Sequence, residues 1–143
     1  MSTIQSAIRT AVRSAVKTAT GLSDAQIFQS PRIKVPIELF PAISIYSLSD
    51  RSVDPDADHL LPHDRIYQYV VDVQIQGAHE EDATDALAIK IRQAILADDT
   101  YGQLVLRTQW TDQQWGGLDL APPISGTALT FESHYRFHPN EEA

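Results

Sequence analysis

The sequence predicts an α+β fold: a mostly antiparallel four- to five-stranded sheet with two helices packed on one face and a long loop after the first strand. Two segments, 3–20 and 82–96, repeat apolar residues with the spacing of a helix. Two others, 66–76 and 127–137, alternate apolar and polar residues, as strands of a half-covered sheet do. Packing both helices on one face of the sheet is the simplest way to bury these apolar surfaces.

The helix predicted over residues 3–20 has a broad apolar stripe. Two adjoining rows form it: Ile4, Ile8, Val12 and Val16, and Ala7, Ala11, Ala15 and Ala19. Arg9, Arg13 and Lys17 line the opposite side. Ser2 is the expected N-cap, and Gly21 suits the position that follows the helix.

The first strand is expected late, at residues 43–48, because three prolines interrupt residues 22–42. The acidic segment from Ser49 to Arg65 follows it and is expected to be a flexible loop. The best strand of the sequence comes next, at 66–76, with one apolar and one wetter face.

The second helix, predicted at 82–96, starts with acidic residues that favour a helix N-terminus. Its expected buried stripe comprises Ala83, Leu87, Ile91, Ala94 and Ile95. A strand is then predicted at 104–110, a turn at Gly116-Gly117 and a break at Pro122-Pro123. The last strand is predicted at 127–137, before a frayed tail at 138–143.

Length and composition favour one domain over residues 1–143, made as a soluble protein in the cytoplasm. The chain has no cysteine, which excludes disulfides and thiol catalysis. Its net charge is −8, yet the first 23 residues carry three of the 11 basic residues and none of the 19 acidic ones, so the body is −11. An acidic body repels a phosphate backbone, which argues against general nucleic-acid binding.

Motifs for catalysis or metal binding are weak. Asp54, Asp56 and Asp58 alternate as in a calcium loop, but the glycine and glutamate that such a loop requires are replaced by His59 and Arg65. No nucleophile elbow or glycine-rich phosphate loop is present in the sequence. We therefore expect no enzymatic activity, no cofactor and no resident metal.

Candidate interaction residues are the basic row Arg9, Arg13 and Lys17, which could contact an acidic neighbour or simply be solvated. Charged residues of the long loop complete the candidate interface: Asp50, Arg51, Asp54, Asp56, Asp58 and Arg65. Trp110 and Trp115 flank a predicted turn and fit either a core or an interface.

The order and texture of these segments resemble the tail terminator (tail completion) proteins of long-tailed bacteriophages, of the minor tail protein U type. The matching segments are IQSAIRTAVRSAVKTA, FPAISIYSLSD, RIYQYVVDVQIQG, DATDALAIKIRQAIL and ISGTALTFESHYRF, spread over residues 4–137. The resemblance implies a structural virion protein at the head-proximal end of the tail, assembled in the host cytoplasm. It also implies a homo-hexameric ring that caps the tail tube, stops its polymerisation and offers a surface to the head–tail connector.

The implied partners are a second copy of the chain, the tail tube protein and the head–tail connector protein, with DNA passing through the lumen without specific binding. An acidic loop facing the lumen would repel that DNA. Two alternatives stay open at this point. One is a head–tail connector or stopper subunit, and the other is a small dimeric α+β domain that binds a regulatory ligand.

Overall fold

The computed structural model describes residues 3–29, 39–56, 58–77, 80–118 and 124–139. These residues form an α+β fold, as the sequence predicts. The elements, in chain order, are α1 (Ile4–Thr20), a 3-10 turn η1 (Asp24–Gln26), β1 (Ile27–Phe28), β2 (Ala42–Ser52), β3 (His63–Gln76), α2 (Glu81–Ala97), β4 (Arg107–Leu118) and β5 (Ile124–Phe137). Within the described residues, no helix is long and apolar enough to span a bilayer.

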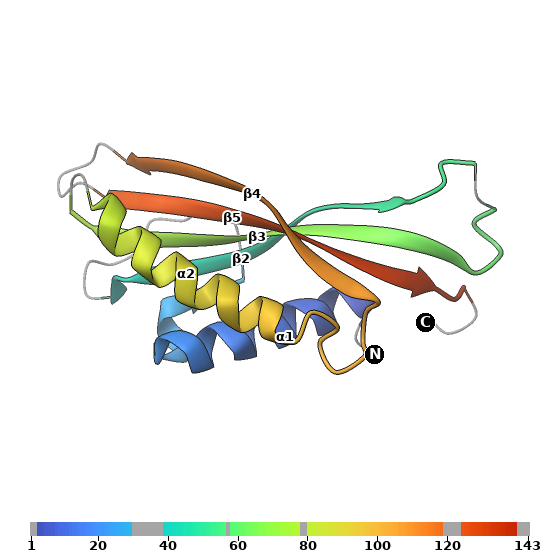
Figure 1. The fold of residues 1–143 in the computed structure, drawn as a ribbon, viewed down its shortest axis with the longest axis horizontal. Coiled ribbons are helices and arrows are strands. Elements are labelled where there is room, and N and C mark those ends of the chain that lie inside the picture. The colour runs from blue at the N-terminus through green and yellow to red at the C-terminus, as the bar shows by residue number, and fades with distance from the viewer. Residues whose placement is uncertain (1–2, 30–38, 57, 78–79, 119–123, 140–143) are drawn as a thin grey trace.

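The five strands form one sheet in the order β1-β2-β3-β5-β4. The short β1 is parallel to β2, and every other neighbouring pair is antiparallel. Figure 1 shows both helices on the same side of this twisted sheet. One face of the sheet is therefore packed against α1 and α2. No helix among the described residues covers the other face, which we call the open face.

The apolar core lies between the helices and the sheet. It joins Ile8, Val12 and Val16 of α1 to β2, β3, α2 and β5. Tyr69, Val71 and Val73 of β3 face this core, as their alternation predicts. The prediction of a wetter opposite face is wrong near the middle of β3, where Asp72 and Gln74 are also buried.

The helix termini follow from local sequence. Thr3 caps α1, because its hydroxyl accepts a hydrogen bond from the Ser6 backbone N–H at 3.1 Å. Ser2, the expected cap, lies outside the described residues. Gly21 ends the helix in the left-handed conformation at φ 71°, as predicted.

The buried side of α2 differs in part from the predicted stripe. Ile91 and Ile95 are buried, but Thr84 and Ala88 accompany them, while Ala83 is exposed. The helix is therefore rotated so that a threonine enters the core. The Thr84 hydroxyl is satisfied there, because it donates to the Glu81 carbonyl at 2.9 Å.

Three predictions for the last third of the chain differ from the structure. The strand expected at 104–110 is β4, which starts only at Arg107 and continues to Leu118. Gly116 and Gly117 do not form a turn, since they pair with β5 within the sheet. The turn expected between the two tryptophans is also absent, because a β-bulge between Trp110 and Asp112 keeps this segment in β4.

The loop predicted from Ser49 to Arg65 is shorter in the structure, because both of its ends are strand. β2 continues to Ser52 and β3 begins at His63, so both ends of the expected loop are paired strand. β5 extends beside them, with Phe137 opposite His63. Figure 1 shows this hairpin projecting beyond both helices along the long axis of the molecule. We call residues 48–66 the arm.

Candidate functional site

A β-bulge sets the geometry at the base of the arm. The register between β2 and β3 shifts between Ser47 and Ser49, so that Asp50 lies opposite Tyr67. Tyr67 faces the helices, and the shift therefore places Asp50 on the helix-covered face as well. Without the shift, the alternation along β2 would turn this carboxylate to the open face.

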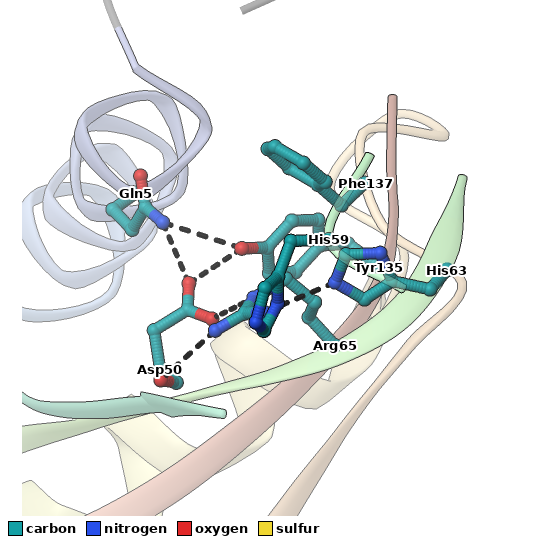
Figure 2. Close-up of a pocket in the computed structure, with 7 residues that line it drawn as sticks. All are labelled: Gln5, Asp50, His59, His63, Arg65, Tyr135 and Phe137. Atoms are coloured by element: carbon teal, nitrogen blue, oxygen red, sulfur yellow. Dashed lines mark hydrogen bonds and ion pairs between the residues drawn. The ribbon is translucent and has the colours of Figure 1, made fainter. Parts of the chain in front are cut away.

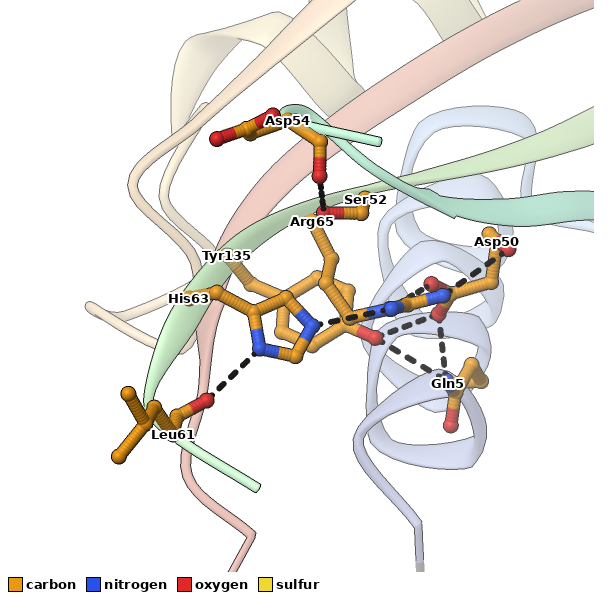
Figure 3. A network of polar contacts seen from close by, with 8 residues as sticks. All are labelled: Gln5, Asp50, Ser52, Asp54, Leu61, His63, Arg65 and Tyr135. Atoms are coloured by element: carbon orange, nitrogen blue, oxygen red, sulfur yellow. Dashed lines mark hydrogen bonds and ion pairs between the residues drawn. The ribbon is translucent and has the colours of Figure 1, made fainter. Parts of the chain in front are cut away.

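Asp50 joins four elements through its carboxylate (Figure 3). One oxygen accepts hydrogen bonds from the Gln5 side-chain amide of α1 at 2.6 Å and from the Tyr135 hydroxyl of β5 at 2.5 Å. The other accepts from the Arg65 Nε of β3 at 2.6 Å. Arg65 Nη2 also donates to the Asp50 backbone carbonyl at 3.2 Å. We call Gln5, Asp50, His63, Arg65 and Tyr135 the Asp50 cluster.

His63 completes the cluster through both of its ring nitrogens. Its Nδ1 lies 2.8 Å from the Leu61 carbonyl, and its Nε2 lies 3.1 Å from Arg65 Nη1. A carbonyl only accepts and a guanidinium only donates, so Nδ1 carries the proton and Nε2 accepts. The ring thereby ties the tip of the arm to its base.

A small pocket of ≈ 370 Å³ opens beside the cluster (Figure 2). Its lining comprises Gln5, Asp50, His59, His63, Arg65, Tyr135 and Phe137. The carboxylate and the guanidinium in this lining bind each other, and His63 packs on Phe137 with 5.2 Å between ring centroids. The two charges of the lining therefore hold each other in place.

The contacts within the cluster raise the pKa of both Tyr135 and Arg65. Burial raises the pKa of Tyr135, and its hydrogen bond to the Asp50 carboxylate raises it further. Burial acts to lower the pKa of Arg65, but the hydrogen bond and charge of Asp50 outweigh it and raise this pKa. The cluster therefore keeps a neutral tyrosine and a charged Arg65 at physiological pH.

The basic row of α1 is used within the chain. Arg9 Nη1 donates to the Tyr67 hydroxyl at 2.8 Å and to the Ser47 hydroxyl at 2.9 Å. Arg13 donates to the Ile27 carbonyl at 2.7 Å and to the Asp24 carbonyl at 3.0 Å. These contacts dock α1 on β2 and on the η1–β1 segment. The sequence placed both arginines on a free face, whereas the structure half-buries them.

Lys17 is the exposed member of that row. Its ammonium lies 3.1 Å from Asp24, and together with Arg13 it lowers the pKa of that carboxyl. The contact lies on the surface, where an ion pair contributes little to stability. Lys17 remains available to a partner, and its predicted interface role stays a prediction.

The acidic residues of the arm tip do not converge. Asp54 and Asp58 each accept a backbone N–H two residues on, from Asp56 at 2.9 Å and from Leu60 at 2.9 Å, as in Asx turns. All three aspartates are exposed. Among the described residues, no group of three or more acidic or histidine side chains could hold a metal ion.

Apolar side chains on the arm were missed as candidates from the sequence. Leu60 is 82% exposed and Leu61 is 59% exposed, and Leu48 and Val53 are also more than half exposed. A leucine pair inside an acidic segment was the available signal. All four of these side chains lie on the arm.

Both tryptophans lie at the sheet edge and contact α2. The Arg92 guanidinium lies 4.2 Å from the centre of the Trp110 ring, a cation–π contact. Trp115 Nε1 donates to Asp85 at 2.7 Å. Trp110 is 39% and Trp115 is 53% exposed, so both rings remain open to a partner.

Comparison with known proteins supports the fold. A chain of the solved virion of a native gene transfer agent particle aligns with a TM-score of 0.57 at 9% identity, over 91% of this chain and 92% of that chain. A second solved chain aligns at 14% identity over 92% of this chain and 97% of that chain, with a TM-score of 0.47. No protein-family model and no curated protein matches the sequence. This fold is thus shared with a virion component.

Proposed function

We propose that this chain is a structural protein of a phage-type virion and acts as a tail terminator. In this role copies form a ring that caps the tail tube, stops its polymerisation and joins the tail to the head–tail connector. The observation that carries the proposal is the projecting arm with its exposed apolar side chains. The fold shared with a gene transfer agent virion chain supports it.

The arm has the properties of an assembly element. Full burial of a leucine contributes roughly 1.5–3 kcal/mol, and Leu60 and Leu61 are largely exposed. The Asp50 cluster ties the base of the arm to α1 and β5, and we expect this to reduce the conformational entropy lost on binding. A pre-ordered apolar projection suits repeated contact between identical subunits or with the tube.

The negative charge of the arm tip suits a channel through which DNA passes better than a site that binds DNA. Asp54, Asp56 and Asp58 are exposed together at the arm tip. If the tip faces the lumen, these carboxylates repel the passing phosphates and prevent sticking. Replacing all three by asparagine is expected to slow DNA ejection, and unchanged infection kinetics would remove the lumenal assignment.

The function we propose is not catalytic. In the pocket beside the Asp50 cluster, the strongest donors and acceptors are already engaged with one another. A ligand would have to break these hydrogen bonds to gain its own. The pocket therefore does not favour the alternative of a ligand-binding regulatory domain.

The first test is light scattering behind size exclusion over a wide concentration range. A mass that rises and stops at six subunits supports the ring, whereas a stable dimer at every concentration contradicts it. Electron microscopy of particles lacking the protein then separates the two phage roles. Overlong tails indicate a terminator, and tailless heads that leak DNA indicate a stopper.

A further inference from the structure

Among the residues that the structure describes, the sheet has an edge without a strand partner on each side. β4 is the last strand of the sheet, and among the described residues nothing pairs with its outer edge. On the other side, β1 covers β2 only at Ile43 and Ser44. The β2 segment 47–52 therefore presents a second edge without a described strand partner (Figure 1). Unpaired strand edges are templates for another chain.

We propose that the β4 edge of one copy pairs with the 47–52 edge of the next copy, so that the sheets continue from subunit to subunit around the ring. The inference rests on the proposed ring and names the surfaces that form it. Each copy contributes one edge to each neighbour, which makes the contact heterologous, or head-to-tail. The occupant of each edge is therefore a second copy of this chain.

The directions of the strands permit this pairing of β4 with the 47–52 edge, which we call the joint. Successive pairs from β2 through β3 and β5 to β4 are antiparallel, so β4 runs opposite to β2. A rotation that relates ring subunits about an axis along the strands preserves their directions. β4 of one copy thus meets β2 of the next as an antiparallel pair, with the helices of both copies on the same face. A two-fold axis would instead join β4 to β4.

Charge selects the register of the joint. Within one subunit, Arg51 lies in line with Arg107 across the sheet, through Ile66 and His134. An unstaggered joint would therefore oppose two arginines. Suppose that the neighbouring copy is displaced along the strands by four residues, from the level of His134 to the level of Thr130 on β5. Asp112 of β4 then lies opposite Arg51 of β2.

The open face carries both members of this pair. Arg51 shares a face with its cross-strand partner Ile66, and Asp112 shares that face through its partner Thr130. Both side chains are exposed, and Arg51 also lies 3.7 Å from Glu132 of its own chain, so it would bridge that carboxylate and Asp112 of the neighbour. Closing a sheet on itself requires such a stagger between strands. A staggered joint is therefore compatible with ring closure, and the charge match selects which stagger we propose.

This register predicts a second contact. Moving two residues along each antiparallel strand from the Arg51–Asp112 pair places Gln114 opposite Ser49. Both residues are exposed and lie on the open face. Cysteines in such a pair come close enough for a disulfide. Because the sequence has no cysteine, every cross-link will come from the introduced residues.

The test is oxidative cross-linking of the full chain carrying Ser49→Cys and Gln114→Cys. A ladder of covalent multimers that ends at the ring is expected on a non-reducing gel. The matched control carries Ser49→Cys and Gln109→Cys, which uses the same two strands, the same face and exposed positions but the wrong register. This control and the single variants are expected to stay monomeric on the gel.

Other outcomes separate this inference from the proposed function. Dimers from Gln114→Cys alone would show a two-fold β4–β4 contact and overturn the head-to-tail pairing. A six-subunit mass by light scattering without the ladder would overturn the edge pairing and leave the ring standing. An unmodified chain that stays monomeric at all concentrations would also overturn the pairing, and the micrographs would then decide the tail role.

Charge reversal provides a check that does not depend on disulfide geometry. Asp112→Arg is expected to weaken association by about fivefold for each joint, because a favourable cross-strand pair becomes repulsive. Adding Arg51→Asp to the same chain is expected to restore association. If the double variant associates no better than Asp112→Arg alone, the two residues are not partners across the joint.

Discussion

Replacing Asp50 by alanine is expected to loosen the base of the arm. The carboxylate accepts hydrogen bonds from Gln5, Arg65 and Tyr135 and forms an ion pair with Arg65. The Arg65 and Asp50 side chains are only 23% and 19% exposed. The substitution therefore leaves a largely buried guanidinium without its anion and a tyrosine hydroxyl without its acceptor.

The magnitude follows from this burial. Breaking a fully buried ion pair costs about 3–5 kcal/mol, and a hydrogen bond to a charged group contributes about 1.5–3 kcal/mol. Water reaches about a fifth of each side chain and re-solvates part of the charge. We expect Asp50→Ala to lower the free energy of unfolding by about 2–3 kcal/mol, or about 6–9 °C in Tm.

The assay is urea unfolding followed by circular dichroism, at a concentration where light scattering reports only monomers. Asp56→Ala is the control, because Asp56 is exposed at the arm tip, and a change within about 0.5 kcal/mol is expected. A double-mutant cycle with Tyr135→Phe should give a coupling energy of about 1 kcal/mol. A loss for Asp50→Ala no larger than the control's would refute the argument that this cluster holds the arm.

Three further predictions concern separate parts of the chain. Gly21→Ala should cost about 1 kcal/mol in urea unfolding, because φ at Gly21 is 71°, whereas Gly116→Ala, with no atom within 4 Å of the added methyl, should be nearly neutral. Serine at both Leu60 and Leu61 should reduce self-association in light scattering while leaving the unfolding midpoint unchanged, and a large drop in that midpoint would show that the leucines support the monomer. The raised pKa of Tyr135 stabilises the fold fully below pH 10.0, its ordinary value, and this contribution is lost as pH rises toward the folded pKa, so Tyr135→Phe should flatten the alkaline loss of stability.

Local periodicity was enough to predict the helices and the central strands. α1, α2, β3 and β5 fall within a few residues of the segments expected from apolar spacing. Such patterns work because a helix or strand buries one side at a fixed interval. Gly21 was predictable for a related reason, since its left-handed conformation depends on its own backbone alone.

The arm and β4 were not predictable from local pattern. Ser49–Ser52 and His63–Arg65 have the composition of a loop, but they are strands because β5 extends far enough to pair with β3 along its whole length. Gly116 and Gly117 favour a turn locally, and pairing with β5 overrides that preference. In both places the strand partner lies outside the segment whose own composition favours a loop or a turn.

The candidate site also has features that the sequence determined and features that only the tertiary structure decided. The sequence by itself determined the absence of cysteine, the acidic body, the basic first helix and the individual candidates Asp50 and Arg65. Only the tertiary structure decided that these two form one cluster with Gln5 and Tyr135, which lie 45 and 85 positions from Asp50. The physical reason is that composition fixes which groups need partners. Strand register, here displaced by a bulge before Asp50, fixes which partners they meet.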